Sequence, residues 1–241
     1  MRRPVCLMVL AVLLGGIVLL LAADAPAQSK SKEKAKKKGS KGHPTYVFVD
    51  STFAPQGTNR IAVNLTNTTG DADAYHEFYT LLENAIRDKA GFILIPREDV
   101  AIEAEKKGLK NEQQALARRW KEERKVDPEM LRRVSSELGL SYYLEGELTE
   151  WNSQQVDWNV EGYSHSEVKA EIRIFSGTTG QLVYEAHDRV ELKSQLHDPR
   201  AQGGMVDDLG IQRGGSQVVP PAPPIKDAAE EVAKNLVSAI P

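Results

Sequence analysis

The side chains that could do chemistry are thinly spread along this sequence of 241 residues. The five histidines are isolated, so none forms the H-x-x-x-H pair that holds a metal on a helix. The single cysteine, Cys6, lies in the apolar N-terminal segment. No nucleophile elbow of the G-x-S-x-G type, no phosphate-binding loop and no G-x-G-x-x-G motif is present. We therefore expect no catalytic residue, no metal site and no bound cofactor.

Two pairs of carboxylates have the spacing of an acid pair. Asp71 and Asp73 precede a predicted helix, where negative charge stabilises the helix dipole. Glu145 and Glu147 share one face of a predicted strand, and a general acid and base is the alternative interpretation of that pair. We expect instead that they pair with cations on the neighbouring strand, with Lys169 or Arg173 as partners.

Aromatic residues gather around one polar connection between two predicted strands. Trp151, Trp158 and Tyr163 fall within thirteen residues of one another. Aromatic side chains at such a place either fill a core or anchor a partner, because they dominate binding hot spots. These three residues are our candidates for contact with a partner.

The N-terminus has the features of an export signal. Arg2 and Arg3 are followed by an uncharged apolar run over 5–23, and Ala25-Pro26-Ala27 offers small residues for cleavage before Gln28. The alternative is an uncleaved signal that anchors the chain, since the run approaches the length that spans a bilayer. Either way the sequence predicts a periplasmic or secreted protein.

A basic segment follows the signal and precedes an acidic body. Residues 28–43 are rich in lysine, serine and glycine and are predicted to be disordered. They form either a solvated spacer or an electrostatic contact with an anionic membrane surface. The net charge of the whole chain is −3, so the remainder is acidic and a poor ligand for nucleic acid. The lysines are Lys30, Lys32, Lys34, Lys36, Lys37, Lys38 and Lys41.

The body alternates between strand and helix patterns and is predicted to be a mixed α/β domain. We expect a single mixed sheet with helices packed on it, a three-stranded antiparallel meander that is wet on one face, and a closing helix. The mostly charged segment 111–125 is expected to be a surface helix. The predicted divisions are a signal peptide (1–27), a linker (28–43), an α/β domain (44–198), a flexible Gly/Pro-rich loop (199–224) and a docking helix (225–241).

Four motifs of the body are similar to those of known envelope proteins. They are Arg60–Val63 with Asn67–Gly70, Gly91–Glu98, Leu138–Glu147 and Thr179–Val183. This order resembles the α/β domain of the curli-secretion (CsgG-like) lipoproteins, the penicillin-binding-protein activator lipoproteins and the N-terminal domain of TolB. The resemblance implies their fold and a place in the bacterial envelope. It does not imply their lipid anchor, because Cys6 stands at the wrong end of the apolar run.

The sequence thus favours a non-enzymatic envelope protein that binds or helps assemble another envelope component, either a protein or a cell-wall component. Two alternatives remain open. One is a secreted hydrolase with a dispersed active site, and the other is a structural subunit of a homo-oligomer. A pocket with convergent polar groups of perturbed pKa would favour the hydrolase. An aromatic-rimmed surface without such a pocket would favour the binding protein.

Overall fold

The computed structural model describes residues 44–89, 91–199 and 219–241. All of them belong to the second of the two units into which the chain divides, Lys34–Pro241. The predicted signal, the lysines of the linker and most of the Gly/Pro-rich stretch lie outside the described residues.

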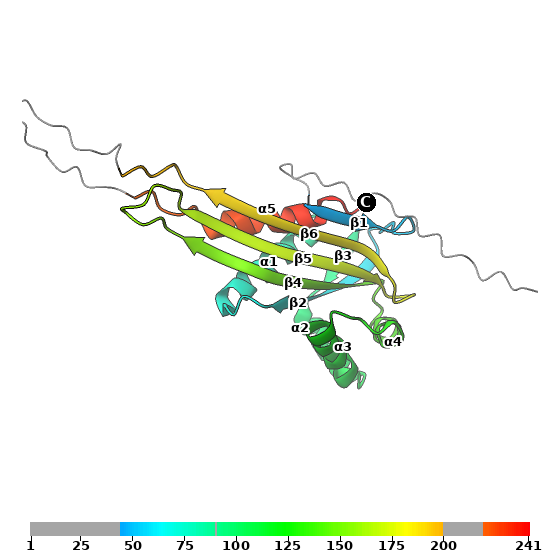
Figure 1. Cartoon of the computed structure of the whole chain (residues 1–241). Coiled ribbons are helices and arrows are strands. Elements are labelled where there is room, and N and C mark those ends of the chain that lie inside the picture. The colour runs from blue at the N-terminus through cyan, green and yellow to red at the C-terminus, as the bar shows by residue number, and fades with distance from the viewer. Residues whose placement is uncertain (1–43, 90, 200–218) are drawn as a thin grey trace, which may run out of the picture. The chain divides into compact units, whose positions relative to one another are not determined.

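A mixed sheet of six strands, in the order β1-β6-β5-β4-β2-β3, organises the described residues (Figure 1). Strand β2 is parallel to both β3 and β4, whereas β4, β5, β6 and β1 form an antiparallel series. The predicted fold class, including the three-stranded meander, is confirmed. The strands are β1 (Tyr46–Val49), β2 (Asn59–Asn67), β3 (Phe92–Ile95), β4 (Tyr142–Gln154), β5 (His165–Ser176) and β6 (Leu182–Lys193).

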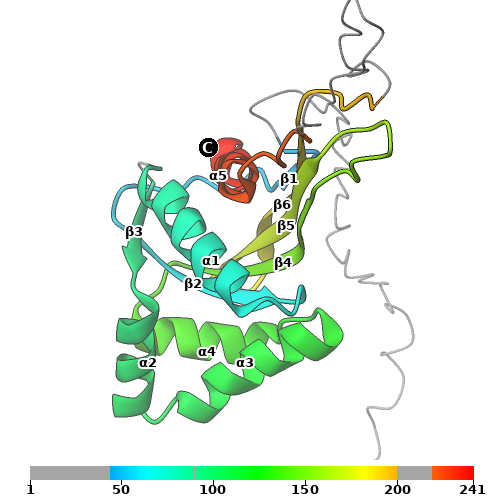
Figure 2. The same ribbon diagram turned by 90° about the vertical axis from the view of Figure 1, so that its left-hand side faces the viewer.

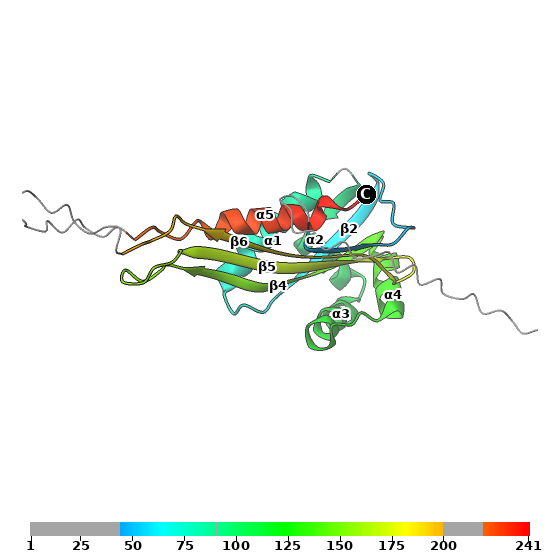
Figure 3. The same cartoon turned by 45° about the horizontal axis from the view of Figure 1, so that its top comes forward.

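Helices cover both faces of this sheet (Figure 3). Helices α1 and α5 pack on one face, and α2, α3 and α4 pack over part of the other. The helices are α1 (Ala72–Arg87), α2 (Arg97–Lys106), α3 (Lys110–Glu123), α4 (Pro128–Leu138) and α5 (Ile225–Ser238).

Helix α5 completes the larger core. Its buried stripe packs on the apolar face of β5 and β6 and against α1. The Tyr184 hydroxyl donates to the Leu236 carbonyl at 2.5 Å, and the Asn235 amide donates to the buried Asp188 carboxylate at 2.8 Å. The second bond matters because a buried carboxylate needs donors. Asp188 has a further donor in the Thr45 hydroxyl, at 2.9 Å.

Helix α3 lies at the surface, as the sequence predicts, and most of its side chains are exposed or half-buried, but it also docks on the sheet. Its Leu116 and Trp120 are fully buried in the smaller core. The Trp120 ring meets Phe175 edge-on, with ring centroids 6.4 Å apart, and lies 4.9 Å below the Arg173 guanidinium. Two apolar residues four positions apart are enough to dock a charged helix, because they share one narrow face.

Local sequence signals set the helix ends. Asp71 caps α1 by accepting from the backbone of Asp73 and Ala74, which supports the structural interpretation of the Asp71–Asp73 pair. Asp127 caps α4 in the same way, and Gly139 ends that helix with a left-handed φ of 63°.

The parallel strands form the order β3-β2-β4 at one end of the sheet. The chain runs from β2 to β3 through α1 on one face, and from β3 to β4 through α2, α3 and α4 on the other. The connections therefore leave the carboxyl ends of the adjacent strands β2 and β3 over opposite faces of the sheet, which is where open α/β sheets form ligand crevices. Strand β3 also stops at Ile95, opposite Ala62, so β2 continues beyond it with a free edge.

Candidate functional site

The loop between β4 and β5, residues 155–164, carries two of the three aromatic residues that the sequence selects. Figure 2 shows this hairpin reaching beyond the helices that cover the sheet. Trp158 is 65% exposed and Tyr163 is 48% exposed. Exposed apolar residues that gather in one region mark interaction sites, so these two remain candidate contacts.

Trp151 lies elsewhere. It is half-buried and packs against the larger core, opposite Val168 of β5. A register shift between Leu148 and Glu150 turns it to the core face, because one extra residue in a strand reverses the faces of those that follow. The structure therefore does not bring Trp151 together with Trp158 and Tyr163.

A buried histidine holds the loop in place. His197 is fully buried, and its Nε2 lies 2.8 Å from the Trp158 carbonyl oxygen. Its backbone exchanges two hydrogen bonds with Gly162, next to Tyr163. On the other side, the hydroxyl of Ser164 donates to the Pro220 carbonyl at 2.5 Å. The backbones that carry the two exposed aromatics are thus fixed by specific contacts.

Two aliphatic side chains add to the exposed aromatics, and we call the four residues the tip patch. The loop itself is acidic, since residues 155–164 contain two carboxylates, Asp157 and Glu161, and no lysine or arginine. The tip patch consists of Trp158, Val160, Tyr163 and Leu196.

A second candidate site lies beside the middle of β2, next to the carboxyl end of β3, between the sheet and helices α2 and α3. It is a cavity of about 230 Å³, which we call the edge cavity. Its polar lining comes from Asn64, Arg97, Tyr143, Gln113 and Gln114. Its apolar lining is Ala62, Val63, Val100, Ala101 and Ala117.

Glu145 lies behind two residues of the edge cavity, Asn64 and Tyr143. It is fully buried, and Asn64 donates to its Oε2 at 2.6 Å, whereas its Oε1 has no hydrogen-bond partner among the described residues. Burial raises the pKa of Glu145 to about 8, against the opposing effects of Asn64 and Tyr143. The carboxyl is therefore mostly uncharged at neutral pH.

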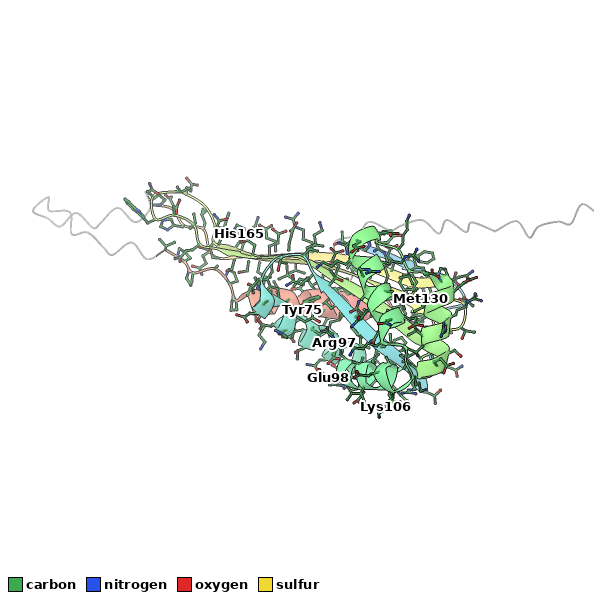
Figure 4. All side chains as sticks on the ribbon, turned by 90° about the horizontal axis from the view of Figure 1, so that it is seen from below. Tyr75, Arg97, Glu98, Lys106, Met130 and His165 are labelled. Carbon is green, nitrogen blue, oxygen red and sulfur yellow. The ribbon has the colours of Figure 1, made fainter. Side chains whose placement is uncertain are left out.

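Arg97 stands at the mouth of the edge cavity, where β3 ends. Its guanidinium donates to the Tyr75 hydroxyl and lies 5.7 Å from the Tyr75 ring centroid (Figure 4). Within the described part of the chain, no carboxylate lies at ion-pair distance from it.

The charged face of the meander differs from our expectation. Glu145 and Glu147 are buried rather than solvent-exposed, and neither forms an ion pair with Lys169 or Arg173. Glu147 instead forms an ion pair with Arg124, at the end of α3. Helix α3 covers this part of the face, which is why the strand pattern alone misplaces both carboxylates.

Arg173 joins two other carboxylates on the same face. It pairs with Glu171 at 2.9 Å and with Glu185 at 2.5 Å, and His187 lies 3.0 Å from Glu185. Hydrogen bonds from His187 and Arg173 lower the pKa of Glu185, although burial opposes them. Each member of this network has a partner, so the network is typical of a structural ion-pair cluster.

Neither a metal centre nor a membrane span emerges from the residues that the structure describes. No three of their His, Cys, Asp or Glu side chains cluster closely enough to hold a metal ion. None of their helices combines the length and the apolarity that crossing a bilayer requires.

Sequence reasoning missed the edge cavity altogether. The sequence pattern places Arg97 in a motif only, and Glu145 in a motif and in a carboxylate pair. The end of β3 at Pro96, directly before Arg97, is the one local signal that could have indicated it, because it marks the carboxyl end of a parallel strand.

Searches with family models and with curated proteins find no match for this chain. Among solved structures, the PelC dodecamer from Paraburkholderia phytofirmans aligns with a TM-score of 0.43 and 13% identity, covering 80% of this chain and 94% of that one. Lipoprotein GNA1162 from Neisseria meningitidis aligns with a TM-score of 0.42 and 16% identity, covering 60% and 90%. TolB from Acinetobacter baumannii is one of the proteins that the sequence motifs resemble. It aligns with a TM-score of 0.29 and 12% identity, covering 60% of this chain and 25% of that one. Similarity at this level assigns no function.

Proposed function

We propose that this chain is an exported, non-enzymatic envelope protein that binds another envelope protein through the tip patch. The observation that carries the proposal is an exposed Trp158 and Tyr163 on a loop whose backbone is fixed by His197. A preordered loop loses little conformational freedom on binding, so its aromatic side chains can contribute fully to affinity.

The charge around the tip patch selects a protein over a membrane surface. The loop that carries three of the four apolar residues, 155–164, contains the carboxylates Asp157 and Glu161 and no lysine or arginine. Anionic phospholipid headgroups would be repelled by them, whereas a protein with an apolar pocket and a basic rim would be complementary. The lysines of the linker, Lys30 to Lys41, are then a separate tether that contacts the membrane surface.

The edge cavity does not make hydrolysis the better proposal. A carboxyl with a raised pKa does lie near it, but Glu145 is behind Asn64 and Tyr143 and is not part of the lining. A general acid must reach the atom that it protonates. The cavity supports binding of a small molecule, and the tip patch supports binding of a macromolecule.

Site-specific photocrosslinking tests the proposal. A benzophenone amino acid is placed at Trp158, and in a control protein at Ile102, which is 50% exposed on α2. We expect one envelope protein to be captured from position 158 and not from position 102. With that protein purified, Trp158→Ala should weaken binding at least tenfold, while Ile102→Ala should leave it within twofold.

Three outcomes would contradict the proposal. Equal binding by the two alanine variants would show that the patch is not the contact. Sedimentation with anionic phospholipid vesicles that depends on Trp158 would assign the patch to a membrane surface. Capture of a second copy of this chain would favour the homo-oligomer.

A further inference from the structure

We infer that the edge cavity is a binding site for a small carboxylate with a short apolar side group. This inference is independent of the proposed function, because the tip patch and the edge cavity share no residue. Figure 4 shows His165, at the base of the hairpin loop, well apart from Arg97 and Tyr75.

The position of the cavity is the first argument. It lies beside the middle of β2 and next to the carboxyl end of β3, and the connections that follow these two adjacent strands run over opposite faces of the sheet. Such a crevice is created by the topology itself and is the usual ligand site of open α/β sheets. The floor is provided by the strand residues Ala62, Asn64 and Tyr143, and the walls come from α2 and α3.

The charge of the lining is the second argument. Arg97 is the one ionised side chain among the lining residues, and no described carboxylate pairs with it. Its contact with Tyr75 holds the guanidinium in place without an ion pair. A guanidinium is well suited to bind a carboxylate, because its planar donors match the two oxygens.

The buried carboxyl of Glu145 does not oppose this assignment. Glu145 is buried behind Asn64, and because its pKa is raised to about 8 it is mostly protonated at neutral pH. An incoming carboxylate therefore meets Arg97 without repulsion from Glu145.

The size and the remaining lining define the rest of the ligand. A volume of about 230 Å³ corresponds to about eight water molecules in the liquid, so the ligand is of amino-acid size. The amides of Gln113 and Gln114 can bind one amide or hydroxyl group. The small walls at Ala101 and Ala117 leave room for a methyl or isopropyl group.

The inference is tested by titrating the purified protein with N-acetylalanine and with its uncharged amide. Isothermal calorimetry measures the affinity, and NMR of the alanine methyl groups locates the site. We expect the acid to bind, the amide to bind at least tenfold more weakly, and the signals of Ala101 and Ala117 to shift. Equal affinity for the two compounds, or no binding of the acid at millimolar concentration, would overturn the inference.

Two variants and a matched control sharpen the test. Arg97→Ala should weaken binding of the acid at least tenfold, while Arg132→Ala on α4 should leave it within twofold. Ala117→Leu fills the cavity without removing a polar group and should abolish binding even if Arg97→Ala is unstable. Unchanged binding in Ala117→Leu would place the ligand elsewhere.

The source of the carboxylate is decided by a third compound. Acetyl-Gly-Gly-Ala carries the same terminal carboxylate on a longer chain. Binding equal to that of N-acetylalanine identifies a peptide C-terminus as the ligand, and binding at least tenfold weaker identifies a free small molecule. Both results retain Arg97 as the carboxylate-binding residue.

Discussion

Replacing Glu145 with glutamine should make the protein more stable at neutral pH. The side chain is fully buried, one of its oxygens accepts from Asn64, and the other has no partner among the described residues. Glutamine keeps the shape and the acceptor for Asn64 but cannot ionise. The variant therefore removes the cost of keeping an ionisable group in the core while leaving the packing in place.

The size of the effect follows from the pKa of Glu145. Burial raises it from 4.5 to about 8, so the unfolded chain releases the proton at a lower pH than the folded protein does. The folded state then binds more protons than the unfolded state between these values, and the free energy of unfolding falls as pH rises. At about 1.4 kcal/mol per pH unit, the loss reaches about 3 kcal/mol at pH 7.

Urea unfolding of the wild type and Glu145→Gln at pH 4, 5, 6, 7 and 8 measures this difference. We expect the two proteins to have similar free energies of unfolding at pH 4, and the variant to become progressively more stable above pH 5. Taking the difference between them cancels the titration of every other group. Parallel pH profiles would refute the reasoning and would mean that the pKa of Glu145 is the same in the folded protein as in the unfolded chain.

Two further substitutions test the packing of the helices. Leu236→Ala in α5 should lower the free energy of unfolding by about 2–5 kcal/mol, because it leaves a cavity in the larger core. A loss of less than about 1 kcal/mol in urea unfolding would mean that α5 is not part of that core. Arg124→Ala should lower the free energy of unfolding by about 1–3 kcal/mol, because it leaves the buried Glu147 without its partner. Arg118→Ala, at an exposed position of α3, is the control. Equal unfolding midpoints for these two variants would contradict the role of the ion pair.

Short-range patterns were sufficient to predict most of the secondary structure. The alternation of apolar and charged residues in β5 and β6 indicates strands with two different faces, and that period is a property of the local chain. The limits of α4 are equally local, since Asp127 and Gly139 satisfy or end its backbone hydrogen bonds themselves. The export signal, the domain limits and the linker remain predictions, as does the likeness to curli-secretion proteins.

The candidate sites depended on contacts that the sequence does not record. Trp151 and Trp158 are close in sequence, but the register shift between Leu148 and Glu150 turns Trp151 towards the core, whereas Trp158 lies in the exposed loop. Such a shift is determined by pairing with β5, so it cannot be read from β4 alone.

Burial of the carboxylates was likewise decided by tertiary structure. The alternation in β4 places Glu145 and Glu147 on the charged face, and the sequence determined that much. Whether that face meets water depends on α3, which docks there through Leu116 and Trp120. Helix α3 contributes Gln113, Gln114 and Ala117 to the edge cavity, whose other walls come from β2, α2 and β4. A strand pattern fixes which side chains share a face, but only packing between distant segments sets the solvent exposure of that face and hence the chemistry of its carboxylates.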